Sequence, residues 1–172
     1  MKNYLIPIIA FFPMLLFAQT EGTSKTGHSE VVEVKNATAK ILTERASNYL
    51  ALKKIEAKTI GSVVSGTGVF NVTYASIKKG FDQGHVKFKI KIMIKDGKYK
   101  MDLTDFIHEG IHGKSSGGSI DLEKPECGEV QIMATAWSSI KSQTQDHIKA
   151  FVKELKVKMD NPVKAAAPSS DF

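Results

Sequence analysis

The chain has 172 residues, a formal net charge of +6, 42% hydrophobic residues and a single cysteine, Cys127. This length corresponds to one domain with short extensions. A lone cysteine excludes an intramolecular disulfide, so the hydrophobic core must hold the fold. The positive charge favours acidic partners but identifies none.

The first 18 residues have the features of a secretory signal peptide. Lys2 supplies a positive start, residues 5–17 are almost entirely apolar, and Ala18 is a small residue before the expected cleavage point. The apolar run is shorter than the ~20 residues that span a bilayer. We therefore expect an exported protein, periplasmic or extracellular, with no transmembrane segment after cleavage.

Composition predicts the remaining boundaries. Residues 19–35 are mostly polar and are expected to form a flexible leader, with a short strand at 31–34. Residues 36–159 are expected to form a single domain. Residues 160–172 contain two prolines and three consecutive alanines, which is typical of a disordered tail.

A helix is predicted to start the domain. Either Asn36 or Thr38 caps its N-terminus, and it continues to about Lys53. Its apolar residues recur at helical spacing: Ile41, Leu42, Ala46, Tyr49, Leu50 and Leu52.

Residues 55–74 are rich in β-branched and aromatic side chains, which favours strands. Three glycines interrupt this segment, at positions 61, 66 and 68, and they indicate either a hairpin or a bulged, bent strand. Residues 75–85 are expected to form a loop.

Residues 86–106 predict a β-hairpin whose register follows from the pattern. Apolar residues alternate with lysines up to Asp96-Gly97, a pair typical of a type I′ turn. That turn pairs Lys95 with Lys98. A one-residue slip would place apolar residues opposite lysines, so the register is strongly specified. The expected pairs are Ile94–Tyr99, Ile92–Met101 and Ile90–Leu103 on one face, with Lys91–Asp102 and Lys89–Thr104 on the other.

After the hairpin, residues 107–119 contain four glycines and are expected to form a mobile loop, followed by a short strand around Ile120 and Leu122. A long helix is then predicted over residues 129–159. Its apolar stripe consists of Met133, Trp137, Ile140, Thr144, Ile148, Phe151 and Leu155, widened by Val130, Ile132 and Val152.

These elements predict an α+β fold, with an N-terminal helix and a long C-terminal helix packed on one face of an antiparallel sheet. The glycine-broken strand at 63–68, the turn at 94–100 and the Leu-Thr-Asp-Phe sequence at 103–106 suggest a family. Over residues 38–155 the chain resembles domain-of-unknown-function family 4468, exported Bacteroidetes proteins described as having a TBP-like fold. The resemblance implies a curved sheet and export, and it carries over no catalytic or binding residue.

Residues His108 to His112 spell the H-E-x-x-H sequence of zinc metalloproteases. That chemistry requires a helix that aims His108 and His112 at one metal ion, with Glu109 as general base. Here the segment leaves a strand at Phe106 and enters a glycine-rich stretch, with Gly110 inside the motif. We therefore expect a polar loop with no metal or cofactor, and keep a zinc-dependent hydrolase as the alternative.

A row of lysines marks the outward face of the hairpin. No aromatic or arginine side chain interrupts the row, which disfavours a nucleic-acid surface. A solvated or edge-protecting face is the first interpretation, and binding of an anionic glycan, lipid headgroup or acidic partner is the second. The row comprises Lys87, Lys89, Lys91, Lys98 and Lys100 as candidate contacts, together with Lys95.

The sequence therefore predicts a non-enzymatic exported domain that binds a ligand or partner, either an acidic envelope component or a small molecule. A zinc hydrolase and a structural envelope protein are the two alternatives. No nucleic-acid partner is expected.

Overall fold

The structure, a computed structural model, describes residues 25–75, 81–111, 116–129 and 131–160. The expected signal peptide and most of the expected tail lie outside these residues. The elements follow in the order β1 (His28–Glu33), α1 (Ala39–Leu52), β2 (Ala57–Ile60), β3 (Val63–Ala75), β4 (Phe81–Lys95), β5 (Lys98–Gly110), β6 (Gly118–Ser119) and α2 (Ala134–Asp160).

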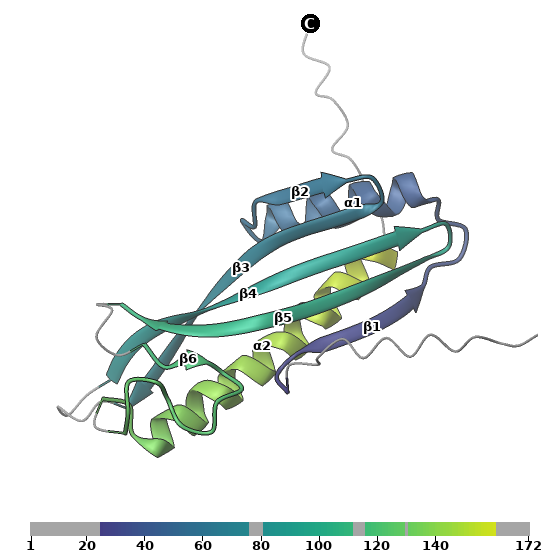
Figure 1. Cartoon of the computed structure of the whole chain (residues 1–172). Coiled ribbons are helices and arrows are strands. Elements are labelled where there is room, and N and C mark those ends of the chain that lie inside the picture. The colour runs from purple at the N-terminus through teal and green to yellow at the C-terminus, as the bar shows by residue number, and fades with distance from the viewer. Residues whose placement is uncertain (1–24, 76–80, 112–115, 130, 161–172) are drawn as a thin grey trace, which may run out of the picture.

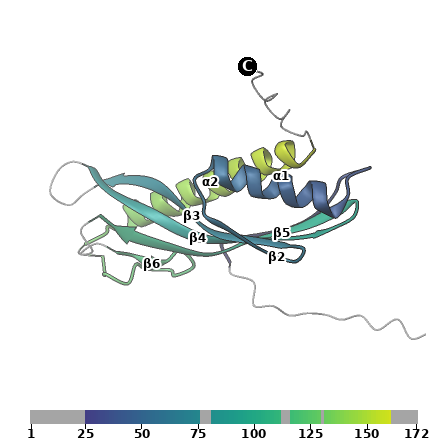
Figure 2. The same cartoon turned by 90° about the horizontal axis from the view of Figure 1, so that it is seen from above.

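The strands form one curved antiparallel sheet of six strands (Figure 1). The order across the sheet is β1-β5-β4-β3-β2, and β6 also pairs with β5. Both helices lie on one face of the sheet (Figure 2), so the predicted α+β architecture is confirmed. No helix of the described residues lies on the opposite face, which we call the open face.

The hydrophobic core lies between the helices and the sheet. On β4, the alternate residues Val86 to Ile94 are all buried. The predicted stripe of α2 faces them, with Trp137, Ile140, Thr144, Ile148, Phe151 and Leu155 all buried. At 27 residues, α2 is about 40 Å long and crosses the sheet. Within the described residues, no helix has the length and apolarity that a membrane crossing requires.

The register of the β4–β5 hairpin is the predicted one, from Lys95 opposite Lys98 to Lys89 opposite Thr104. The turn is not type I′, however, because only Gly97 has a positive φ, 73°. The reason is a contact with the start of α1. Asp96 Oδ1 accepts a hydrogen bond from the Ala39 N–H at 2.6 Å, and the Gly97 N–H donates to the Ala37 carbonyl at 2.8 Å.

Of the two predicted caps for α1, the structure uses Thr38. Its backbone is extended and its Oγ1 accepts a hydrogen bond from the Ile41 N–H at 3.4 Å. The strand β1 precedes this cap and spans His28–Glu33. It lies inside the segment 19–35, which we expected to be a flexible leader, and it starts three residues before the expected strand at 31–34.

The segment 55–74 forms a hairpin of β2 and β3, and β3 continues through both of its glycines. Gly68 is needed because Phe88 packs against its backbone: a Cβ at position 68 would lie 2.4 Å from the Phe88 ring. The prediction of a loop over 75–85 was wrong for its last part, since β4 begins at Phe81.

A β-bulge extends β5 beyond its predicted end at Phe106. Lys89 pairs with Thr104 but Lys87 pairs with Ile107, so two residues of β5 face one of β4. Asp105 absorbs the extra residue with φ 55°. After the bulge the even-numbered residues face the core, and Phe106 and His108 are buried. The prediction of a loop from residue 107 was therefore wrong up to Gly110.

The helix α2 also protects an edge of the sheet. β3 extends past β2, and near its end the Gln143 side chain bonds to the Thr73 backbone. Gln143 Oε1 accepts from the Thr73 N–H at 3.2 Å, and Gln143 Nε2 donates to the Thr73 carbonyl at 2.9 Å. After β5, the strand β6 lies at residues 118–119, just before the predicted position around Ile120.

Candidate functional site

Outward side chains of neighbouring strands line up in rows on the open face. Pairing places Val63 beside Met93, Met93 beside Lys100, and Lys100 beside Val31, with Ile60 next to Val63 on the other side. We call this the apolar row, because only Lys100 in it is charged. The next row, which we call the polar row, contains Lys58, Ser65, Lys91, Asp102 and Ser29.

Described residues line two hollows on the open face. The first, called the polar hollow, has a volume of about 570 Å³. It lies over β2, β3, β4 and β5, where small hydroxyl side chains leave room between lysines. It is lined by Glu56, Lys58, Ser65, Gly66, Thr67, Lys89, Ile90, Lys91 and Thr104.

The second, called the apolar hollow, has a volume of about 440 Å³ and follows the apolar row. Its only charged lining residues are lysines, and no carboxylate lines it. The lining residues are Val31, Ser62, Val63, Met93, Ile94, Lys95, Lys98, Tyr99 and Lys100.

Ion pairs divide the lysines of the open face into two groups. Lys87 pairs with Glu109 at 2.7 Å, Lys89 with Asp105 at 2.8 Å, and Lys100 with Asp102 at 3.2 Å. The other group forms no ion pair with any residue that the structure describes, and it consists of Lys58, Lys91, Lys95 and Lys98.

The predicted lysines thus share one face, as expected, but they are not equivalent. Lys87, Lys89 and Lys100 are neutralised by partners, whereas Lys91 and Lys98 are available to a ligand. Sequence reasoning missed Lys58 and the hydroxyls that complete the polar hollow. The pairing of β2 with β3 places Lys58 beside Ser65, and the pairing of β3 with β4 places Ser65 beside Lys91. The sequence pattern of β4 does not specify either pairing.

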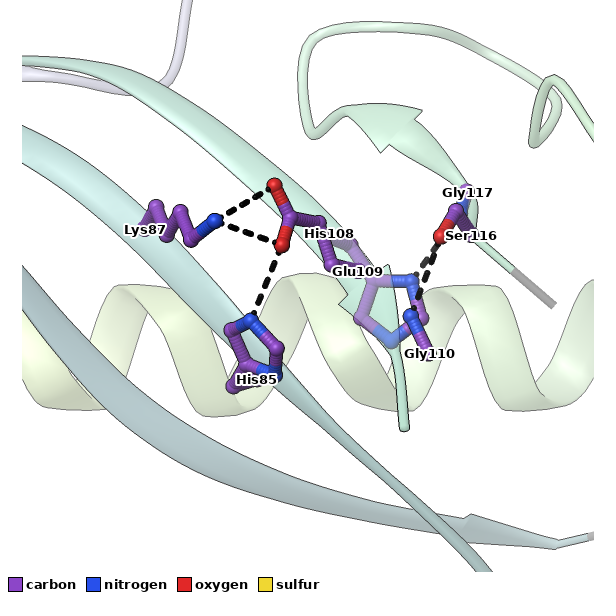
Figure 3. Close-up of polar contacts among 7 residues, drawn as sticks. All are labelled: His85, Lys87, His108, Glu109, Gly110, Ser116 and Gly117. Atoms are coloured by element: carbon purple, nitrogen blue, oxygen red, sulfur yellow. Dashed lines mark hydrogen bonds and ion pairs between the residues drawn. The ribbon is translucent and has the colours of Figure 1, made fainter. Parts of the chain in front are cut away.

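The H-E-x-x-H sequence lies in a strand in its first part. Successive strand residues point to opposite faces, so His108 enters the core while Glu109 stands on the open face (Figure 3). Glu109 accepts hydrogen bonds from Lys87 at 2.9 Å and contacts His85 at 3.0 Å. The bond from Lys87, reinforced by His85, holds the pKa of Glu109 below its ordinary value.

His108 is fully buried. Its Nδ1 accepts a hydrogen bond from the Gly117 N–H at 3.1 Å (Figure 3), which ties the segment before β6 to β5. The His108 ring packs edge-on against two aromatic rings, with its centroid 5.4 Å from that of Tyr74 and 6.0 Å from that of Trp137. Burial, and secondarily the charge of His85, lowers the pKa of His108 to about 4.

This arrangement differs from that of a zinc hydrolase, which needs two imidazoles on one helix face. The imidazole of His108 packs in the core with Glu109 turned away from it. His112 lies outside the described residues. Within the part of the chain that the structure describes, no three His, Cys, Asp or Glu side chains are grouped to hold a metal ion.

No protein-family model and no curated protein matches the chain. Solved structures do match. The chain is similar to a DUF4468 family protein from Bacteroides ovatus, with a TM-score of 0.59 and 11% identity over 79% of this chain and 86% of that one. It is also similar to a TBP-like protein from Parabacteroides distasonis, with a TM-score of 0.58 and 12% identity over 78% of this chain and 92% of that one.

The chain has a TBP-like fold. The resemblance inferred from the hairpin and the glycine-broken strand is therefore confirmed for the architecture. At these identities the similarity shows the fold alone, and function must be argued from the site.

A TBP-like sheet does not in itself indicate nucleic-acid binding. On β1, β2, β3, β5 and residues 85–95 of β4, the outward side chains that the structure describes include no Phe, Tyr, Trp or Arg. Nucleic-acid surfaces use such side chains to stack on bases. The absence of a nucleic-acid partner stays a prediction, and the composition of the open face supports it.

Proposed function

We propose that this protein is an exported, non-enzymatic binding protein whose open face takes an anionic ligand. One observation carries the proposal. The polar hollow contains Lys58 and Lys91, two lysines without ion-pair partners among the described residues, beside hydroxyl groups. Export rests on the apolar segment at residues 5–17.

The lining of the polar hollow suits a phosphate, sulfate or carboxylate group. Lys89 is paired with Asp105, and the two other lysines of the lining, Lys58 and Lys91, stand against one glutamate, Glu56, so the local charge is positive. Ammonium groups attract an anion as point charges, and hydroxyl groups add hydrogen-bond donors. Ser65, Thr67 and Thr104 provide those hydroxyls on adjacent strands.

The residues of the polar hollow favour binding over catalysis. Among the described residues, no hydrogen bond joins the hydroxyl of Ser65, Thr67 or Thr104 to a histidine, a lysine or a carboxylate that could act as a base. Nucleophilic catalysis requires a base within hydrogen-bond reach of the hydroxyl.

The test is a titration of the ¹⁵N-labelled mature protein with pyrophosphate and with a sulfated glycan, followed by NMR. We expect amide shifts at Lys58, Ser65, Lys91 and Thr104. The double variant Lys58→Gln/Lys91→Gln should weaken binding by about tenfold or more, because it removes both unpaired charges.

The matched control is Lys40→Gln/Lys153→Gln. It removes the same net charge from exposed positions on the two helices, away from the open face. The control should bind as the wild type does. Equal weakening in both double variants would show unspecific charge attraction, and no shift with either anion would refute the proposal.

A further inference from the structure

The apolar row exposes hydrophobic side chains on a face that no described helix or strand covers. Ile60 is 77% exposed and Val31 is 60% exposed, at the two edges of the sheet. Val63 and Met93, between them, are only half-buried. Ile60, Val63 and Met93 are neighbours in the row, and Lys100 separates them from Val31. Exposed apolar surface with a polar rim is typical of a binding site.

The shape of the row is that of a trough. The apolar hollow of about 440 Å³ lies along it, from Val31 on β1 to Val63 on β3. Strands are spaced about 4.8 Å apart, so a row across five strands is about 19 Å long. An extended alkyl chain fits such a trough, whereas insertion into a bilayer would use protruding side chains.

The charges around the apolar hollow are all of one sign. Lys95, Lys98 and Lys100 line it, and Lys95 and Lys98 have no ion-pair partner among the described residues. Lysine stems can lie along apolar surface while their ammonium groups reach a charged group. The occupant therefore combines apolar surface with negative charge.

The apolar hollow adjoins the polar hollow. Met93 lines the first and Lys91 the second, and they are neighbours on the same face of β4. Residues two apart in a strand are separated by about 7 Å. A single molecule can therefore occupy both hollows.

We propose that the ligand is a single anionic amphiphile, with its acidic headgroup in the polar hollow and its alkyl chain along the apolar row. This inference rests on the proposed function and names its ligand class. The headgroup contacts Lys58 and Lys91, and the chain covers Val63 and Met93.

The experiment is calorimetric titration of the mature protein with methyl, butyl, hexyl and octyl phosphate below their micellar concentrations. Full burial of a methylene group strengthens binding about fourfold, and an open trough buries about half of it. We expect the affinity to rise about twofold for each added methylene.

Met93→Gln should make the affinity nearly independent of chain length, because it replaces an apolar side chain by a polar one of similar size. Ile107→Gln is the matched control: Ile107 is 43% exposed on the open face of β5 and lines neither hollow. The control should keep the chain-length dependence. Equal thermal stability of the two variants shows that both fold.

Three outcomes would overturn the inference. If the phosphates bind with equal affinity at every chain length, the proposal of an amphiphilic ligand is refuted and the proposed anion site is retained. If none of the phosphates binds, the amphiphilic ligand and the proposed anion site are both refuted. Sedimentation with phosphatidylglycerol vesicles without binding of monomeric octyl phosphate would show that the open face docks on a membrane surface instead.

Discussion

The buried imidazole of His108 should make the protein less stable in mild acid. Burial lowers the pKa of His108 from 6.5 to about 4 in the folded state. The unfolded chain takes up a proton as the pH falls through about 6.5, whereas the folded chain resists protonation until about 4. The stability that depends on neutral His108 is therefore fully present above pH 6.5 and is lost as the pH falls toward 4.

The size of the loss follows from the separation of the two pKa values. At 1.36 kcal/mol per pH unit, the complete loss amounts to about 3 kcal/mol. Between pH 7.5 and pH 5 it amounts to about 2 kcal/mol. Keeping the pH at 5 or above limits the contribution of carboxylates such as Glu30 and Glu109, whose pKa values lie below the ordinary 4.5.

The assay is urea unfolding at pH 7.5 and pH 5, for the wild type and for His108→Gln. A glutamine can still accept the Gly117 hydrogen bond but does not titrate, so the variant should lose about 2 kcal/mol less on acidification. Burial also lowers the pKa of His147, which stacks on Phe70 at 3.9 Å. His147→Gln should therefore remove a separate part of the pH dependence.

Reversibility and a single cooperative transition must hold at both pH values for the comparison to be valid. If His108→Gln loses as much stability as the wild type between pH 7.5 and pH 5, the burial of a neutral imidazole is not the cause of the acid sensitivity.

Two further changes test the packing. Asp96→Ala removes the acceptor for the Ala39 N–H and should lower the free energy of unfolding in urea by about 1 kcal/mol. Asp96→Asn retains an acceptor and should lower it by less than half as much. Equal losses in the two variants would show that the contact with α1 is unimportant. Gly68→Ala forces a methyl group against Phe88 and should lower stability by about 1–3 kcal/mol in a thermal melt, whereas Ser65→Ala on the open face should change it by less than about 0.5 kcal/mol. A neutral Gly68→Ala would mean that the Phe88 ring moves aside at little cost.

The hairpin was predictable because its information is local. Alternation from Val86 to Ile94 and a two-residue turn leave one register that buries Ile90, Ile92 and Ile94 with their partners on β5. The stripe of α2 was predictable for the same reason, since a helical period repeated over about six turns has few alternative interpretations. The predicted start at residue 129 was wrong, because α2 begins at Ala134 and Met133 precedes it. The N-cap at Thr38 was one of two candidates that the sequence offered.

The second half of β5 was not predictable in the same way. A bulge at Asp105 inverts the alternation of β5. Without the bulge, the alternation would place Ile107 and Glu109 in the core and His108 outside. Nothing in the residue types marks the bulge, because it depends on how β4 and β5 twist around the core. The glycines that follow then suggested a loop.

The candidate site was predictable in part. Charge alternation on β4 identified an outward lysine face, but it could not separate paired from unpaired lysines. That distinction depends on Asp102, Asp105 and Glu109 from β5. The hollows themselves depend on small side chains of β3 lying beside lysines of β4 across a non-local pairing.

The two hydrogen bonds between the Gln143 side chain and the Thr73 backbone limit the addition of another strand to β3. In an antiparallel strand, alternate residues direct their backbone groups to the same side, so Val69 and Asn71 point the same way as Thr73. β2 covers the start of β3 and the Gln143 amide stands against its end, which leaves a stretch of only a few residues between them. Short free edges of this kind resist pairing with a second chain. The long helix therefore blocks strand addition at the end of β3, and the two edge strands, β1 with 6 residues and β2 with 4, are themselves short.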